Sequence, residues 1–123
     1  MATILALDDV LDAGNLIKRI LERKGHAVSV FTEEADALDF TRRQPVDLAV
    51  LDIKLKKMSG VTVLAELKKI SPATRVIMLT GYPTEKTAQE SLRLGASRYC
   101  TKPIDPDDLE EMVEAVLRES SES

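Results

Sequence analysis

The chain has 123 residues, of which 44% are hydrophobic and 31% are charged, a composition typical of one globular domain with a single core. Its formal net charge is −4 and it has two Tyr, two Phe and no Trp, so it offers neither a positive field nor stacking surfaces for direct binding of nucleic acid. No apolar run approaches the ~20 residues that cross a bilayer, and the first residues lack the basic start and long apolar stretch of a secretory signal. We therefore expect no membrane insertion and a cytoplasmic location.

The first part of the chain alternates strand-like and helix-like segments. Residues 4–7 are continuously apolar, which predicts a strand covered on both faces of a parallel sheet. The next segment has helical spacing, carried by Leu16, Ile17, Ile20 and Leu21. Residues 28–31 mix polar and apolar side chains, which is typical of a less covered edge strand. Ala35 and Leu38 support a second helix after it.

The middle of the chain repeats the same alternation. Residues 48–51 and 76–79 are again continuously apolar and predict two more central strands. Between them, Leu64 and Leu67 indicate a helix that ends near Ser71-Pro72, where proline prevents its continuation.

The last part contains the weakest and the strongest helix of the chain. Residues 84–94 have only three apolar anchors, so we expect this helix to be the least well tethered; the anchors are Ala88, Leu92 and Leu94. Residues 97–100 are mixed and predict the second edge strand. Residues 109–117 match the full amphipathic helix template.

Five β-α units in alternation predict an α/β fold, a doubly wound five-stranded parallel sheet in a single domain. Right-handed crossovers, with strands two and five at the edges, favour the flavodoxin-like order 2-1-3-4-5. We assign residues 1–118 to this domain, and residues 119–123 to a polar tail or the start of a linker.

Charged residues follow the predicted strands at the edge where ligands bind in this topology. Asp8 and Asp9 follow the first strand and Asp52 follows the third, its neighbour in the sheet. Three carboxylates so close repel one another, and their oxygen-only donor set favours Mg²⁺, or Mn²⁺, as the compensating cation. With the Lys102 ammonium and the Thr80 hydroxyl nearby, an aspartate held there could attack phosphorus and form an acyl phosphate.

Each of these residues also has an ordinary interpretation. Asp8 and Asp9 could cap a helix, and Asp52 or Thr80 could be turn residues. Tyr99 could be an edge-strand aromatic and Lys102 a solvated charge. The ordinary interpretations would require five coincidences at one sheet edge. Two residues lack such support and are expected to be unremarkable: His26 as a surface residue before the second strand, and Cys100 as a small buried side chain that cannot form an intrachain disulfide.

Five short motifs occur in order along residues 3–118. They are Leu5-Ala6-Leu7-Asp8-Asp9, then Asp52 followed by Met58-Ser59-Gly60, then Val76-Ile77-Met78-Leu79-Thr80-Gly81, then Gly95-Ala96, then Tyr99 with Thr101-Lys102-Pro103. Each is weak alone, but the ordered set is specific. It resembles the receiver domains of bacterial two-component response regulators, which are signalling phosphoacceptors rather than enzymes and catalyse only their own phosphotransfer and autodephosphorylation.

This resemblance implies a phosphorylation site. Asp52 matches the phosphoacceptor, which takes its phosphoryl group from a phosphohistidine of a sensor histidine kinase or a phosphotransfer protein. Asp9 matches a direct Mg²⁺ ligand, Asp8 one that acts through water, and the Lys54 backbone carbonyl the third protein ligand. Lys102 matches the lysine that pairs with a phosphoryl oxygen.

The resemblance also implies a switch. Thr80 and Tyr99 match the pair that moves on phosphorylation, and the bond from Lys102 to Pro103 would be cis. The change would repack the surface formed by residues 84–94, 97–100 and 109–117, which would control an output domain or protein and could form a homodimer.

The loop after Asp52 departs from the family pattern. Lys56 stands where many receivers have proline, and with Lys54 and Lys57 it makes the loop basic; a solvated loop is the preferred interpretation. By their spacing from Asp52 and Thr80, Lys54 and Tyr82 flank the site opening, and we hypothesise that they set how fast water hydrolyses the acyl phosphate.

Other classes fit less well. A haloacid dehalogenase-type phosphatase needs its second aspartate two residues after the first and a substrate cap, and a flavodoxin needs a first loop rich in Ser, Thr and Gly. Neither GxGxxG nor a P-loop is present. The remaining alternative is a receiver-like interaction module that signals without phosphorylation.

Overall fold

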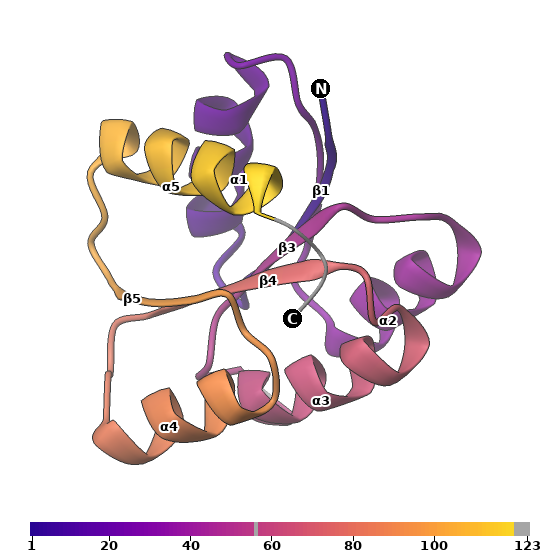
Figure 1. Cartoon of the computed structure of the whole chain (residues 1–123), viewed down its shortest axis with the longest axis vertical. Coiled ribbons are helices and arrows are strands. Elements are labelled where there is room, and N and C mark those ends of the chain that lie inside the picture. The colour runs from indigo at the N-terminus through magenta and orange to yellow at the C-terminus, as the bar shows by residue number, and fades with distance from the viewer. Residues whose placement is uncertain (56, 120–123) are drawn as a thin grey trace.

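The computed structural model describes residues 1–55 and 57–119. Five strands form one parallel sheet in the order β2-β1-β3-β4-β5, and a helix follows each strand (Figure 1). The strands are β1 (Thr3–Leu7), β2 (Ala27–Phe31), β3 (Leu48–Leu51), β4 (Arg75–Thr80) and β5 (Arg98–Thr101). The helices are α1 (Leu11–Glu22), α2 (Glu34–Arg43), α3 (Gly60–Ile70), α4 (Glu85–Arg93) and α5 (Pro106–Arg118). The predicted fold class, strand order and edge strands are confirmed.

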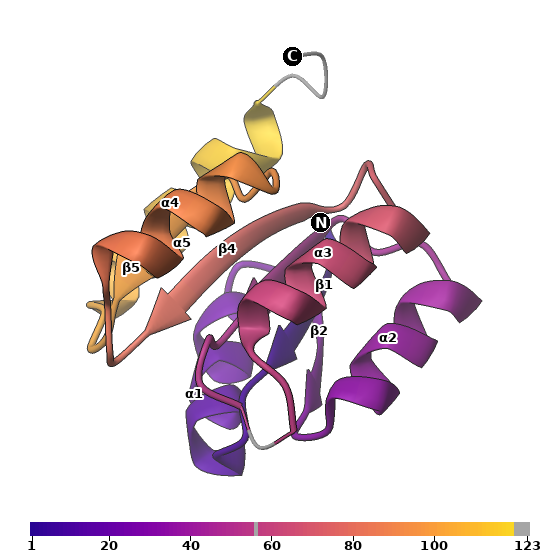
Figure 2. The same cartoon turned by 90° about the horizontal axis from the view of Figure 1, so that it is seen from below.

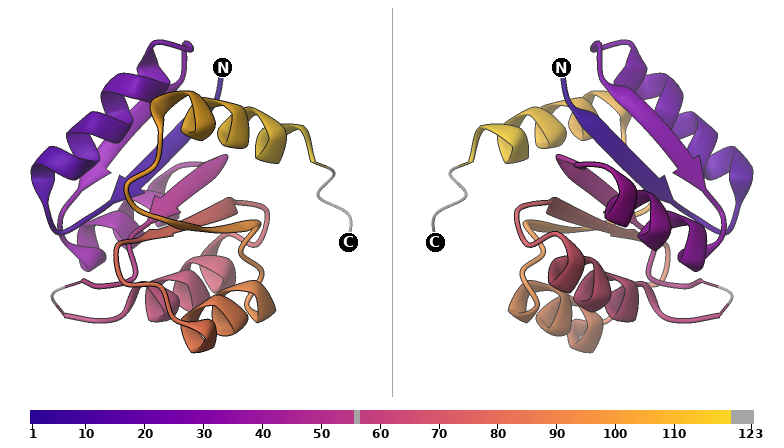
Figure 3. Two further views of the ribbon diagram at one scale, coloured as in Figure 1. Left: turned by 90° about the vertical axis from the view of Figure 1, so that its left-hand side faces the viewer. Right: turned by 90° about the vertical axis from the view of Figure 1, so that its right-hand side faces the viewer.

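The helices form two layers, with α1 and α5 on one face of the sheet and α2, α3 and α4 on the other (Figures 1 and 3). Alternate residues of each central strand enter opposite cores, as the pleat requires. In β1, Ile4 and Ala6 pack with α1 and α5, whereas Leu5 and Leu7 pack with α2 and α3. This double burial explains why the central strands are apolar at every position.

Side-chain caps begin the three C-terminal helices. Ser59 caps α3 by accepting a hydrogen bond from the Val61 amide, and Thr84 caps α4 by accepting one from the Thr87 amide. Asp105 caps α5, whose first residue is Pro106. Helix α3 ends at Ile70, two residues before Pro72, as predicted.

Helix α4 differs from the prediction in what tethers it. Leu92, predicted to be an apolar anchor, is 55% exposed. The fully buried residue of this helix is Ser91, whose hydroxyl has no hydrogen-bond partner among the described residues. The other two predicted anchors, Ala88 and Leu94, are partly buried, and Leu94 packs against the core. One of the three anchors is therefore wrong, and this helix is held by little apolar contact.

Several other single-residue expectations were wrong. His26 is buried, not on the surface: its Nδ1 accepts a hydrogen bond from the Ala2 amide at 3.1 Å, and its Nε2 lies 2.8 Å from Oε2 of Glu114 on α5. Leu16 is exposed on α1, and Ala35 is exposed on α2 where Ala37 packs inward instead. Cys100 is only half-buried.

No helix in the described ranges has the length and apolar character needed to cross a membrane.

Candidate functional site

The carboxyl ends of β1 and β3 bring three aspartates together. Leu7 pairs with Leu51 in the parallel register, so Asp8 and Asp52 leave the sheet side by side. One carboxylate oxygen from each of Asp8, Asp9 and Asp52 lies within 4.8 Å of the others. Asp8 and Asp52 are buried and Asp9 is half-buried. The predicted acidic cluster is therefore present at the predicted sheet edge.

Lys102 links two of these carboxylates at the same edge of the sheet. Its ammonium donates to Asp8 Oδ2 at 2.6 Å and to Asp52 Oδ2 at 3.2 Å. The residue follows β5, its backbone amide donates to the Thr80 carbonyl at 2.7 Å, and its bond to Pro103 is cis. One cation thus lies between two buried anions, which lowers the cost of their burial.

The electrostatics of the site follow from this arrangement. Burial raises the pKa of Asp52, the positive charge of Lys102 lowers it, and the negative charge of Asp8 raises it again, with a net upward shift. Burial alone would lower the pKa of Lys102, but its hydrogen bond to Asp8 and the charge of Asp52 raise it above its ordinary value. Lys102 therefore stays charged at neutral pH.

Backbone amides orient the two buried carboxylates. Asp8 Oδ1 accepts from the Val10 amide at 2.9 Å, and Asp52 Oδ1 accepts from the Lys54 amide at 3.3 Å. Each aspartate therefore has one oxygen held by the loop that follows its strand and the other directed at Lys102.

Thr80 and Tyr99 lie on neighbouring strands but have different partners. Thr80 is fully buried, and its hydroxyl accepts a hydrogen bond from the Tyr82 amide at 3.1 Å. The Tyr99 hydroxyl accepts from the Thr84 amide at 3.3 Å and shares a hydrogen bond with the Thr87 hydroxyl at 2.7 Å. Tyr99 therefore connects β5 to the first turn of α4.

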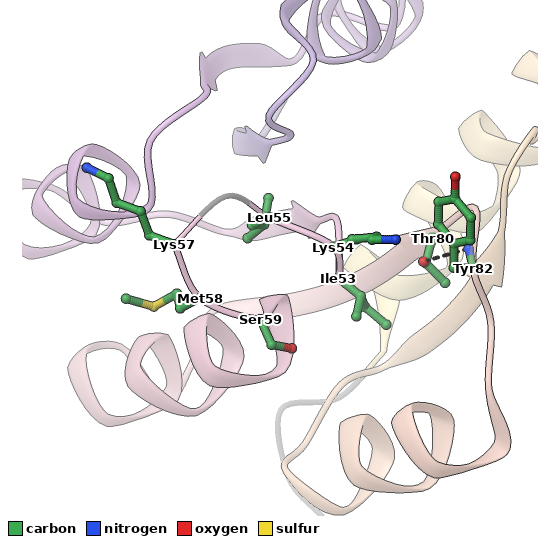
Figure 4. A pocket seen from close by; sticks show the side chains of 8 residues that line it. All are labelled: Ile53, Lys54, Leu55, Lys57, Met58, Ser59, Thr80 and Tyr82. Atoms are coloured by element: carbon green, nitrogen blue, oxygen red, sulfur yellow. Dashed lines mark hydrogen bonds between the residues drawn. The ribbon is translucent and has the colours of Figure 1, made fainter.

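Two hollows meet at the site, with volumes of about 420 Å³ and about 390 Å³. The first holds the three aspartates and Lys102, and the second lies between the β3–α3 loop and Tyr82 (Figure 4). Lys54, Leu55 and Tyr82 line both. The Lys54 ammonium lies 4.3 Å from the centre of the Tyr82 ring, a cation–π contact between the two hollows.

Two residues outside the predicted set shape the β3–α3 loop. Gly60, at the start of α3, packs so closely on Asp52 that a Cβ there would lie 2.0 Å from the Asp52 carbonyl oxygen. Glu34, at the start of α2, is buried, and its carboxylate accepts hydrogen bonds from the Lys57 and Met58 amides. Gly60 appeared in the sequence only as part of a motif, and nothing local separates Glu34 from the neighbouring Glu33. Lys56, the departure noted in this loop, lies outside the described residues.

The chemistry of the donor set fits a hard divalent cation. The clustered side chains are all carboxylates, the donors that Mg²⁺ and Mn²⁺ prefer. The Lys102 ammonium beside them adds a point charge able to bind an anionic oxygen.

Comparison with known proteins agrees with this geometry. The family model for the response regulator receiver domain matches residues 4–114. The transcriptional regulatory protein ZraR of Escherichia coli (strain K12) is 33% identical over 114 residues, which are 93% of this chain and 26% of that protein. Sporulation initiation phosphotransferase F of Bacillus subtilis (strain 168) is 32% identical over 93% of this chain and 92% of its own length. The chain thus spans about a quarter of ZraR but nearly all of the second relative.

Solved structures show the same fold. A CheY-like response regulator receiver domain protein from Methanospirillum hungatei JF-1 superposes with a TM-score of 0.92 at 33% identity, covering 95% of this chain and 94% of that one. A response regulator from Burkholderia pseudomallei, solved with a phosphorylated aspartic acid, a calcium ion and citrate, has a TM-score of 0.86 at 28% identity, covering 98% of this chain and 69% of that one. Fold, acidic cluster and sequence match all agree, and the chain belongs to the response regulator receiver domain family of two-component signalling proteins.

Proposed function

We propose that this domain is a phosphorylation-activated switch of a two-component system. Asp52 would accept a phosphoryl group from the phosphohistidine of a sensor histidine kinase or a phosphotransfer protein. The observation that supports this most directly is the position of Asp52: its carboxylate is in the acidic cluster and hydrogen-bonded to Lys102 at the carboxyl edge of the sheet. Asp8 shares the acidic cluster, a hydrogen bond to Lys102 and the same hollow. The acceptor role goes to Asp52 because Asp52 is the residue that matches the phosphoacceptor position of the family.

The metal would be held by the side chains of Asp9 and Asp52 and the backbone carbonyl of Lys54, with Asp8 acting through a bound water. When bound, Mg²⁺ (or Mn²⁺) would supply positive charge to the phosphoryl oxygens and offset the mutual repulsion of the carboxylates. This proposal fits the all-oxygen donor set, and it gives the orienting hydrogen bond from Lys54 to Asp52 a role in keeping both ligands in place.

In the transfer step, a carboxylate oxygen of Asp52 forms a bond to phosphorus while the bond between phosphorus and the donor's histidine nitrogen breaks, and that nitrogen keeps the electron pair. Lys102 keeps its short hydrogen bond to Asp8 and exchanges its longer bond to Asp52 for one to a phosphoryl oxygen. The domain supplies these groups itself, so small phosphodonors also serve as substrates.

The switch would use hydroxyl groups that already have other partners. The phosphoryl oxygens draw the Thr80 hydroxyl away from the Tyr82 amide, and the Tyr99 ring moves into the space that Thr80 leaves. The Tyr99 hydroxyl is hydrogen-bonded to Thr84 and Thr87 at the start of α4, so movement of the Tyr99 ring repacks the α4-β5-α5 surface. That surface controls an output domain or protein, and it can also support a homodimer.

Lys54 and Tyr82 would tune the lifetime of the acyl phosphate. Both residues line the hollow that contains Asp52, and their cation–π contact would restrict the approach of water to its carboxylate. We expect autodephosphorylation of Lys54→Ala and Tyr82→Ala to be several-fold faster than in the parent domain. The matched control is Lys57→Ala, because the Lys57 ammonium pairs with Glu33 and not with Tyr82. Unchanged autodephosphorylation rates in Lys54→Ala and Tyr82→Ala would refute this role.

We place the switch in residues 1–118, with residues 119–123 as a tail or the start of a linker, in a cytoplasmic protein that makes no direct contact with nucleic acid through this domain. The decisive experiment is intact mass after incubation with acetyl phosphate or phosphoramidate and Mg²⁺, with Asp52→Ala and a chelator as controls. An adduct that needs both Asp52 and Mg²⁺ would support the proposal. No adduct, with a cognate kinase also tried, would favour the module that signals without phosphorylation.

A further inference from the structure

Glu34 is a buried carboxylate outside the acidic cluster. It is only 2% exposed, and no salt bridge joins it to any described residue. Its neighbour Glu33 is an ordinary surface glutamate that pairs with the Lys57 ammonium at 3.4 Å. Burial of a carboxylate without a paired cation costs free energy, so other groups must stabilise the charge of Glu34.

Backbone amides compensate one of the two Glu34 carboxylate oxygens, whereas the other, Oε1, has no hydrogen-bond partner among the described residues. Glu34 Oε2 accepts from the Lys57 amide at 2.8 Å and from the Met58 amide at 2.9 Å. Burial would raise the pKa of Glu34, but these amides, its own amide and the charge of Lys57 outweigh it and lower the pKa. Glu34 is therefore an anion at neutral pH, and it holds the loop through its charge.

The loop that Glu34 holds is the one that carries the site. It starts at Asp52, includes Lys54 and Leu55, which line the hollow of the acidic cluster, and ends at α3. At its far end, the Gly60 amide donates to the Ile53 carbonyl at 2.7 Å, which closes the loop on the sheet. Between these ends, the Lys57 and Met58 amides bond to Glu34, so α2 supports the outer side of the loop.

We propose that Glu34 is a positioning residue for the metal and phosphorylation site, acting through the β3–α3 loop to hold the Lys54 carbonyl in place. The inference rests on the proposed function, because it concerns the same site. Groups that orient metal ligands without touching the metal typically contribute about 10- to 100-fold to metal affinity. Glu34 is at least one step further from the metal, so we expect an effect at the lower end of that range.

The test compares Glu34→Ala and Glu34→Gln with two matched controls, Glu33→Gln and Thr41→Val. Glu33 is the exposed neighbour, and Thr41 is a buried residue of the same helix whose hydroxyl donates only to Ala37. The readouts are the Kd for Mg²⁺ by calorimetric titration, amide hydrogen exchange at residues 54–58, and the rate of modification by acetyl phosphate.

We expect Glu34→Ala to raise the Kd for Mg²⁺ about tenfold and to speed exchange at the loop amides, with modification slowed at limiting Mg²⁺ but recovered at high Mg²⁺. Glu34→Gln keeps an acceptor oxygen without the charge, so its effect should be intermediate, and it serves as the test if Glu34→Ala does not fold. Both control variants should keep the parent Kd.

Three results would overturn the inference. Parental Mg²⁺ affinity and loop exchange in both Glu34 variants would exclude a positioning role while leaving the proposed function intact. An equal loss of affinity in Thr41→Val would show a general effect of destabilising α2. Absence of both Mg²⁺ binding and the adduct in the parent domain would refute the proposed function, and this inference with it.

Discussion

Asp52, the proposed phosphoacceptor, is also a source of instability. Its carboxylate is buried beside Asp8, and its pKa is raised, so the fold disfavours the charged form. Lys102 offsets part of this repulsion but is shared between two anions. The charge that the proposed chemistry needs would thus be kept at the expense of stability, as is common at functional sites.

The first prediction concerns this charge. Because the folded-state pKa of Asp52 is raised, the carboxyl stabilises the fold only at low pH, and that contribution is lost as pH rises through the raised pKa. At neutral pH without divalent cations, Asp52→Asn should therefore be more stable than the parent by about 1 kcal/mol. Adding Mg²⁺ should raise the melting temperature of the parent but not of the variant. Thermal unfolding with and without Mg²⁺ checks this, and a less stable variant without Mg²⁺ would contradict it.

The second prediction concerns His26. Its Nδ1 accepts from the Ala2 amide, so the proton on the ring is at Nε2, directed at Glu114. His26→Ala leaves a buried amide without a partner and should cost about 1–3 kcal/mol of unfolding free energy. Glu114→Gln, at a side chain that is 43% exposed, should cost under about 1 kcal/mol. Urea unfolding of the two variants measures the difference, and equal losses would argue against the assignment.

At the scale of elements, the helices differ in how firmly they are attached. Helix α5 buries Leu109, Val113 and Val116, whereas α4 buries only Ser91. Figure 2 shows α4 at the same end of the sheet as β5, away from α1 and α2. A short, weakly attached helix beside an edge strand has a low cost of movement, which suits the element proposed to move.

The third prediction tests what holds α4. The Ser91 hydroxyl is buried without a hydrogen-bond partner in the described part of the chain, so Ser91→Ala removes an unsatisfied group and adds helix propensity. We expect the variant to gain about 1 kcal/mol in stability and to show slower amide exchange in α4. Gln89→Ala, at an exposed position of the same helix, is the control and should change stability by less than about 0.5 kcal/mol. A loss of stability in Ser91→Ala would mean that the hydroxyl has a partner.

At the scale of the whole molecule, the carboxyl edge of the sheet, which separates the two cores, carries buried charge. The anions Asp8, Glu34 and Asp52 are all buried near loops that close this edge. The pKa of Glu34 is lowered, whereas the pKa of Asp52 is raised. The pH dependence of global stability therefore combines opposite contributions from one region.

The fourth prediction separates these contributions. A group whose folded pKa is lowered stabilises the fold above its unfolded pKa, and loses that effect as pH falls through the folded pKa. The parent should thus be more stable than Glu34→Gln at neutral pH by about 1–3 kcal/mol, and the gap should close as pH falls below the ordinary range of glutamate. Urea unfolding at a series of pH values measures this difference in unfolding free energy. Glu33→Gln is the control, and its difference from the parent should not change with pH. A gap that widens in acid would contradict the assignment.

Much of this architecture follows from local patterns. The central strands are recognisable because burial on both faces leaves no polar position, and the edge strands because one side is less covered. The acidic cluster follows in turn, since parallel strands end at a common edge. The hydrogen-bond partners of individual side chains were less predictable. Nothing local distinguishes Glu34 from Glu33, because the phase of α2 and the path of a distant loop decide which one is buried.

The sequence alone thus determined the order of elements, the sheet topology and the residues gathered at its carboxyl edge, because periodicity and connection rules act over short stretches of chain. Contacts between distant segments bury His26 against α5, leave Leu92 exposed and Ser91 enclosed, and place Glu34 against the β3–α3 loop. These outcomes depend on contacts between segments far apart in the chain, whose relative positions are set by packing rather than by local preference.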